Sequence, residues 1–154
     1  MSIRRMIPAD AAACDAILAK LPCFFPDPVG VANAASDVRR NAGWVSQDDG
    51  VITGFLSLAW STPEAAEIAW MAVDPNFRRG GRGRSMVECA ADHARAEGAK
   101  MLFLFASPVT DPPDVADGFE ATRRFYVAQG FVPLCVIKPE GWSAEHLLMV
   151  RSLR

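Results

Sequence analysis

The feature that most constrains this chain is an apolar segment followed by a loop of glycines and arginines and then by a helical pattern. Residues 66–73 are typical of a buried strand, which Asp74-Pro75 ends. The loop that follows holds four arginines and three glycines between Arg78 and Arg84. Glycines let a backbone turn and approach a ligand, and the free N–H groups at a helix start attract anions. The sequence therefore predicts a phosphate or pyrophosphate site at this loop.

Other interpretations of the loop fit less well. A solvated, arginine-rich turn with no ligand is the plain alternative. A P-loop is not indicated, because no Gly-Lys-Ser/Thr follows the glycines. The dinucleotide fingerprint lacks its third glycine, and no carboxylate follows the next strand, residues 101–105.

Arg78, Gly81 and Gly83 satisfy the pattern Arg/Gln-x-x-Gly-x-Gly, which resembles the acetyl-CoA pyrophosphate loop of the GNAT superfamily of N-acetyltransferases. Residues 70–75 resemble that family's fourth strand, and residues 125–131 resemble its Tyr-x-x-x-Gly-Phe motif. The resemblance implies acetyl-CoA as co-substrate, with its pantetheine arm between the fourth and fifth strands, which splay apart. The residues implied in cofactor binding are Met71, Ala72, Val73, Arg78, Arg79, Gly80, Gly81, Arg82, Gly83, Arg84 and Ser85.

The resemblance also implies two catalytic residues. Glu67 matches the strand glutamate that acts as general base in several members, directly or through water, and regular alternation would place it on one face with Ala69, Met71 and Val73. Tyr126, the only tyrosine, matches the general acid that serves the leaving thiolate. The structural alternatives are that Glu67 is a paired acid and that Tyr126 is a core aromatic residue. The backbone N–H of Met71 or Ala72 is the implied oxyanion donor.

One position departs from the family pattern. Many members carry an asparagine seven residues before the tyrosine, where it holds the pantetheine arm. Here that position is Phe119, so this cofactor contact is not expected to be the usual one.

Composition limits the remaining possibilities. A chain of 154 residues with 51% hydrophobic positions predicts one domain, 1–154, with one substantial core. A net charge of −2 argues against a nucleic-acid binder, and neither a membrane span nor an export signal is indicated. The four cysteines are widely spaced, so no metal site is predicted. Reduced thiols, buried at Cys89 and Cys135, predict a cytoplasmic protein.

The patterns along the chain predict an α/β fold, a GNAT-like mixed and mostly antiparallel sheet of about seven strands flanked by about four helices. Asp10 is expected to cap the first helix, and the continuously apolar strand at 101–105 is expected to be covered on both faces. The expected strands are 2–5, 44–46, 51–60, 66–73, 101–105, 131–137 and 145–153. The expected helices are 10–21, 29–40, 83–97 and 119–129.

The predicted function is acetyl-CoA-dependent transfer of an acetyl group directly to an amine of a small molecule or peptide. Phe24 and Phe25 are expected either to plug a loop or to form a wall of the acceptor site, and His146 is expected to be structural or to line it. An acidic rim would suit a cationic amine, and its members would be Asp27, Asp111, Asp114, Asp117, Glu140 and Glu145.

Several alternatives remain open at this stage. An aminoglycoside- or peptide-directed enzyme is the alternative within the fold, and a non-catalytic acyl-CoA-binding sensor is the main alternative outside catalysis. An RNA binder is disfavoured, because no stacking aromatics accompany the arginines. Whether the protein forms a homodimer through the final strands or Trp142 is also left open.

Overall fold

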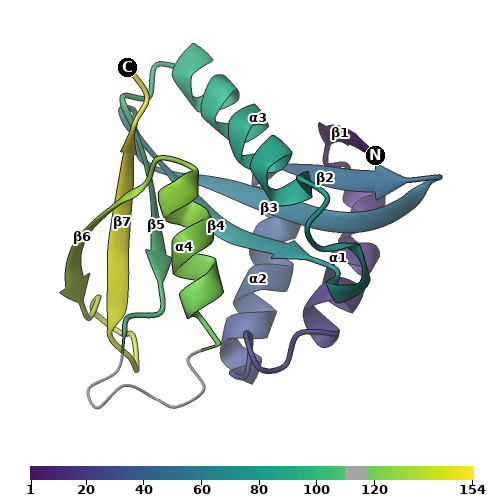
Figure 1. Ribbon diagram of the computed structural model, residues 1–154, viewed down its shortest axis with the longest axis horizontal. Coiled ribbons are helices and arrows are strands. Elements are labelled where there is room, and N and C mark those ends of the chain that lie inside the picture. The colour runs from purple at the N-terminus through teal and green to yellow at the C-terminus, as the bar shows by residue number, and fades with distance from the viewer. Residues whose placement is uncertain (110–117) are drawn as a thin grey trace.

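The computed structural model describes residues 1–109 and 118–154. In these residues seven strands form one mixed sheet in the order β1-β2-β3-β4-β5-β7-β6 (Figure 1). The pair β4–β5 is parallel and the other pairs are antiparallel. The strands are β1 (Ser2–Arg5), β2 (Ala42–Asp48), β3 (Val51–Thr62), β4 (Ala65–Val73), β5 (Met101–Ala106), β6 (Val132–Ile137) and β7 (His146–Ser152). The predicted fold class is confirmed.

Helices cover both faces of the sheet (Figure 1). They are α1 (Ala11–Ala19), α2 (Pro28–Arg40), α3 (Arg82–Ala96) and α4 (Glu120–Ala128), with short 3-10 helices η1 (Pro8–Asp10) and η2 (Pro75–Phe77). α3 and α4 pack on one face, and α1 and α2 pack on the other, each over its own cluster of buried apolar residues. We call these the α3–α4 face and the α1–α2 face.

The apolar stripe of α3 is the clearest case of a local pattern that determines packing. Its members all lie in the core of the α3–α4 face: Met86, Val87, Ala90, Ala91 and Ala94. They recur at helical spacing, so one face of the helix is buried along its whole length. The position of α3 fixes where the glycine and arginine loop meets the sheet.

The caps of the first two helices differ from each other. Asp10 precedes α1, but its side chain accepts from Ile7 N and from Arg4 instead of from the helix. The prediction that Asp10 caps this helix is therefore wrong, because a nearby arginine and the preceding turn take its carboxylate. Asp27 does cap α2, since its carboxylate accepts from Val29 N at 2.9 Å.

β4 separates from β5 after only three residue pairs. Ala65, Ala66 and Glu67 pair with Met101, Leu102 and Phe103, and no later residue of β4 pairs with β5 in the part of the chain described. Just beyond, the pairing of β4 with β3 shifts by one residue, which leaves Ala69 as an extra residue in a β-bulge. A bulge bends and twists its strand. The splay expected from the family resemblance is thus present, and it begins beside this bulge.

The C-terminal half of the sheet is less covered than its sequence predicts. In β5, Leu102, Leu104 and Ala106 are buried under α3 and α4, while Phe103 and Phe105 on the other face are half-buried. The expectation of a strand covered on both faces is wrong, because the α1–α2 helices lie over the N-terminal half of the sheet, as Figure 1 shows.

The cysteines are all free. Cys14 is buried and Cys89 is half-buried, but Cys135 is exposed, contrary to prediction. Cys135 lies in β6, which is the edge strand and pairs only with β7 among the described strands. Its apolar neighbours therefore do not produce burial. Within the described residues no helix is long and apolar enough to cross a membrane.

Candidate active site

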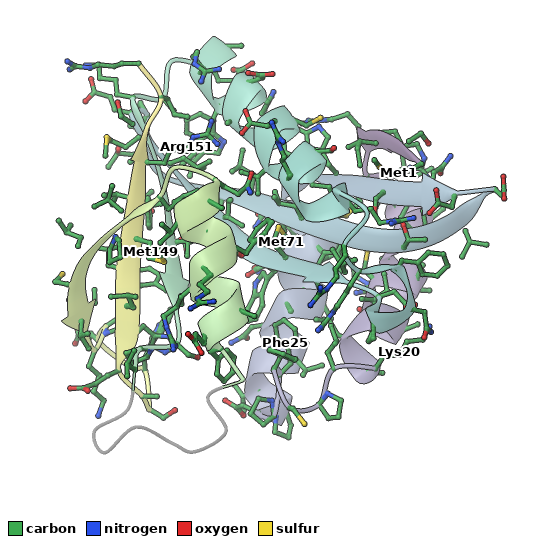
Figure 2. All side chains as sticks on the ribbon, in the orientation of Figure 1. Met1, Lys20, Phe25, Met71, Met149 and Arg151 are labelled. Atoms are coloured by element: carbon green, nitrogen blue, oxygen red, sulfur yellow. The ribbon has the colours of Figure 1, made fainter. Side chains whose placement is uncertain are left out.

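A cavity of about 740 Å³ lies between the splayed strands. Its walls come from β4 beyond Glu67, from the end of β5, from the loop before α3, from α4, and from the connection between α1 and α2. Figure 2 labels Met71 on β4 and Phe25 near the start of α2, at two of these walls. Because β4 lacks a strand partner on this side, its backbone groups are available to a ligand.

The loop before α3 has the backbone expected of an anion site. Gly81 has φ +76° and is the N-cap of α3, which begins at Arg82. Arg79 also has a positive φ, of 64°. The first N–H groups of α3 have no partner within the helix and carry its positive dipole end, so they favour an anion. Arg78, Arg79, Gly81, Arg82, Gly83 and Arg84 all line the cavity.

Gly83 lies at a tight contact between α3 and α4. It lies inside the first turn of α3, so it does not serve the turn itself. A Cβ at this position would lie 3.0 Å from Phe125 Cζ. A larger residue here would therefore crowd the ring of Phe125 on α4.

The arginines of the loop are not equivalent. Arg82 is only 14% exposed, and its guanidinium donates to Phe77 O at 2.8 Å, to Thr53 Oγ1 and to Asp48. It thereby ties the loop to the β2–β3 hairpin. Arg78 lies over the ring of Phe24, with its Cζ 5.3 Å from the ring centroid. Arg79 and Arg84 are exposed.

Glu67 lies on the α1–α2 face. Its neighbours Ala66 and Ile68 belong to the core of the α3–α4 face, so Glu67 points away from them. The expectation that it shares a face with Met71 and Val73 is wrong, because the extra residue at Ala69 reverses the alternation.

The environment of Glu67 favours a protonated carboxyl. Burial raises the pKa of Glu67 above its usual range, and the negative charge of Asp37 on α2 raises that pKa further. No hydrogen-bond or ion-pair partner of its carboxylate occurs among the described residues. The cavity lining begins at Ile68, one residue further along β4.

Tyr126 lies on the α3–α4 face. Its ring packs edge-on against Phe125 and Phe131, with centroids 5.1 and 5.6 Å apart, and the residue is 8% exposed. Burial raises the pKa of its phenol well above the ordinary value. Tyr126 also lines the cavity, and its hydroxyl has no hydrogen-bond partner among the residues described. Glu67 and Tyr126 therefore approach the gap between β4 and β5 from opposite faces of the sheet.

The residues predicted at the acceptor end divide into two groups. Phe24, Phe25 and His146 line the cavity, which favours the wall interpretation of the two phenylalanines. The acidic rim is not found among the described lining residues, which exclude Asp27, Glu140 and Glu145. Three further members of that rim, Asp111, Asp114 and Asp117, lie outside the described residues.

Sequence reasoning missed several residues of the site. Trp70 and Phe105 line the cavity, and the indole N–H of Trp70 donates to Asp37 Oδ2 at 2.8 Å. The strand pattern alone does not place Trp70 in the site, because the face that Trp70 occupies depends on the bulge at Ala69. Asp37, on the predicted second helix, offered no local signal, because its contact with Trp70 spans 33 residues.

No group of three or more potential metal ligands occurs in residues 1–109 and 118–154.

The sequence comparison shows which family this chain belongs to. The family model described as "Acetyltransferase (GNAT) family" matches residues 15–131, about three quarters of the chain, so the protein belongs to that family. Acetyl-CoA is the co-substrate of the family. An amino-acid acetyltransferase of Pseudomonas fluorescens (strain Pf0-1) is 43% identical over 44 residues, which are 29% of this chain and 10% of the relative. The chain thus spans only a small part of that relative's length.

Solved structures agree with the fold. A GNAT-family protein from Desulfovibrio desulfuricans has a TM-score of 0.82 at 20% identity and covers 99% of both chains. The structure of yncA from Salmonella typhimurium, which contains its cofactor acetyl-CoA, has a TM-score of 0.72 at 21% identity and covers 100% of this chain and 94% of its own. At such identities the likeness is one of fold.

Proposed function

We propose that this protein is an N-acetyltransferase that transfers the acetyl group of acetyl-CoA directly to the amine of a small molecule or peptide. The observation that carries the proposal is the cavity between β4 and β5, which joins an unpaired strand backbone to the anion-binding start of α3. A pyrophosphate fits the second feature, and an extended amide-containing arm fits the first. Both features line the same cavity.

The proposed cofactor contacts follow this division. The backbone of Met71, Ala72 and Val73 would hold the pantetheine arm. The loop from Arg78 to Ser85 would hold the pyrophosphate, mainly through the N–H groups that follow Gly81. Exposed Arg79 and Arg84 would supply additional charge, whereas Arg82 would act by holding the loop in place.

Acetyl-CoA supplies the thioester that reacts. In the proposed reaction the amine nitrogen forms the new N–C bond, the C–S bond breaks, and the proton that the amine loses passes to Glu67. The raised pKa of Glu67 makes it a stronger base than an ordinary carboxylate. Because the cavity lining begins at Ile68, we propose that a water molecule relays this proton.

The proposed role of Tyr126 is to donate a hydrogen bond to the departing sulfur. An ordinary thiol has a pKa of about 8.5. The phenol of Tyr126 holds its proton more tightly than that, since burial raises its pKa above the ordinary phenol value. Complete proton transfer to the thiolate would therefore be uphill, and hydrogen bonding would provide the stabilisation. A backbone N–H of Met71 or Ala72 would serve the oxyanion.

Thermal unfolding with CoA tests the cofactor assignment. At a hundredfold excess over the dissociation constant, binding should add about 2.7 kcal/mol to the free energy of unfolding. An unchanged melting temperature at saturating CoA would refute the assignment.

Turnover tests the chemistry. Thiol release from acetyl-CoA with a panel of amines should identify an acceptor. With that acceptor, Glu67→Gln should lower kcat by about 10²–10⁴ and leave CoA affinity unchanged. Glu64→Gln is the matched control, because Glu64 is an exposed glutamate that pairs with Lys100 at 2.8 Å outside the cavity.

A non-catalytic acyl-CoA sensor remains the second candidate. The observation that favours it is the position of Glu67, which is not among the residues that line the cavity. CoA binding without turnover on any amine would support the sensor and contradict the enzyme. A cytoplasmic location is part of the proposal for either function, because all four cysteines are free thiols.

A further inference from the structure

The charges of the cavity lie at one end. Its charged lining residues, among those described, are four arginines, Arg78 and Arg79 in the loop before α3 and Arg82 and Arg84 in the first turn of α3. The described lining includes no aspartate or glutamate. His146 also lines the cavity, and burial lowers its pKa, which disfavours its charged form. The described lining of the acceptor end therefore presents little that would pair with a second charge on a substrate.

Aromatic rings from β4 and the α1–α2 connection form one wall of this end. Trp70 and Phe25 pack with their ring centroids 6.2 Å apart, and both line the cavity. The hydrogen bond from Trp70 Nε1 to Asp37 fixes the indole. The wall is therefore held in place by α2 as well as by its own packing.

A second wall comes from β5 and β7. Phe105 and His146 line the cavity, and Trp142 packs edge-on against both, with centroid distances of 5.3 Å to Phe105 and 4.5 Å to His146. Phe105 and Trp70 flank the opening between the splayed strands. A ring placed in this opening would meet aromatic side chains from both strands.

A third pair of rings lies at the start of α4. Phe119 packs edge-on against Phe24, with centroids 5.4 Å apart, and both line the cavity. An asparagine here would offer an amide to a ligand, but Phe119 offers only an apolar ring. Phe119, which stands where many family members have an asparagine, thus adds a ring to the aromatic lining.

We propose that the cavity selects a primary amine that is carried on an aromatic ring, in preference to a polyamine or an amino sugar. This inference rests on the proposed function. Offset and edge-to-face ring contacts favour an aromatic body, and the indole of Trp70 can attract the ammonium before it loses its proton. Extra ammonium or hydroxyl groups would be desolvated beside rings that cannot hydrogen-bond to them. The amine nitrogen would face the β4–β5 gap, where Glu67 accepts its proton.

The experiment begins with CoA binding by calorimetry, which separates failure of the proposed function from failure of this inference. Three acceptors are then compared with acetyl-CoA: 2-phenylethylamine, spermidine and glucosamine. We expect kcat/KM for 2-phenylethylamine to exceed both others by about tenfold or more. If CoA binds and either polar amine is the better substrate, the inference is overturned and the proposed function stands.

Matched variants identify the residues responsible. Phe105→Leu should raise the KM for 2-phenylethylamine about tenfold and leave CoA affinity unchanged. Phe103→Leu is the control, because Phe103 packs against Phe105 at 5.9 Å on the same strand but does not line the cavity. Equal effects of the two variants would overturn the inference. If Phe105→Leu changes the preference between acetyl-CoA and hexanoyl-CoA but leaves the amine selectivity unchanged, the inference is also overturned. The rings would then contact the acyl chain.

A binding measurement keeps the inference testable without turnover. Calorimetric titration of the protein–CoA complex with 2-phenylethylamine should give a dissociation constant at least tenfold lower than titration with spermidine, and Phe105→Leu should abolish the difference. Equal affinities would overturn the inference even for a protein with no acetyltransferase activity.

Discussion

The carboxyl group of Glu67 is the residue-scale feature with the clearest energetic consequence. It is half-buried without a partner in the described part of the chain, beside the negative charge of Asp37. Its pKa in the folded protein is therefore above its value in the unfolded chain. When the pH rises above the folded pKa, the folded state holds an unfavourable charge that the unfolded chain solvates better.

We expect Glu67→Gln to be more stable than the parent at neutral pH. Below the unfolded pKa of about 4.3 both states bind the proton, so the two proteins should unfold alike. The difference should appear as the pH rises through the raised folded pKa. Denaturant unfolding from pH 4 to pH 8 would measure it, and a variant that is less stable than the parent at pH 8 would contradict the assigned environment.

Two buried serines give a second prediction at this scale. Ser57 and Ser46 are both fully buried, but Ser57 Oγ has no hydrogen-bond partner among the described residues, whereas Ser46 Oγ lies 3.0 Å from Thr53 Oγ1. Ser57→Ala removes an unmet polar group and should leave stability unchanged or raise it by up to about 1 kcal/mol. Ser46→Ala should cost about 1–2 kcal/mol. Equal losses in urea unfolding would show that Ser57 has a partner in solution.

At the scale of elements, the loop before α3 and the first turn of α3 contain two kinds of arginine. Arg82 is held by Asp48, Thr53 and Phe77, while Arg79 is exposed and has no partner among the described residues. Arg82→Ala should lower the melting temperature by several degrees, because it detaches the loop from the hairpin. Arg79→Ala should leave the melting temperature unchanged.

Ligand binding by the same two variants separates structure from recognition. If Arg79 contacts the 3′-phosphate, Arg79→Ala should weaken CoA more than dephospho-CoA, whereas Arg82→Ala should weaken both alike. Calorimetry with each ligand provides the measurement. A selective loss for Arg82→Ala alone would reverse the assignment of the two arginines.

The elements differ in how far sequence could predict them. The helix expected at 83–97 and the strands expected at 44–46 and 51–60, which meet at the Asp49–Gly50 turn with φ of 47° and 81°, follow from local patterns, so their prediction succeeded. The bulge at Ala69 depends on pairing with β3, and no local pattern indicates it. The same holds for the Arg82–Asp48 ion pair, which spans 34 residues. Thus the loop and the candidate residues were predictable, but the faces they occupy were not.

At the scale of the whole molecule, the edge strand β6 presents apolar side chains to solvent. Three apolar side chains of β6 are strongly exposed: Val132 at 60%, Leu134 at 61% and Val136 at 50%. Pro133 removes one N–H donor from this edge, which disfavours simple strand addition. If the protein is a homodimer, we expect side-chain packing at β6 and not edge pairing to join its subunits.

Sedimentation velocity over a range of concentrations tests this prediction. Leu134→Lys should shift a concentration-dependent dimer to monomer, because it places a charge within the apolar surface. Val51→Lys is the control, since Val51 is 57% exposed but lies in β3 at the hairpin turn. A parent protein that sediments as a monomer at every concentration would exclude the dimer.

The opening of the sheet depends on the number of residues in β4, because Ala69 is the extra residue of the bulge. The bulge bends the backbone of β4 just after Glu67 and Phe103 make the last pair with β5. A substitution at Ala69 changes a side chain and leaves this bend in place. Deleting Ala69 should instead let β4 and β5 pair as far as Val73. Hydrogen exchange at Met71 and Val73 should then slow, and CoA binding should be lost. The capacity to hold a ligand would then depend on one residue's presence, whatever its chemistry.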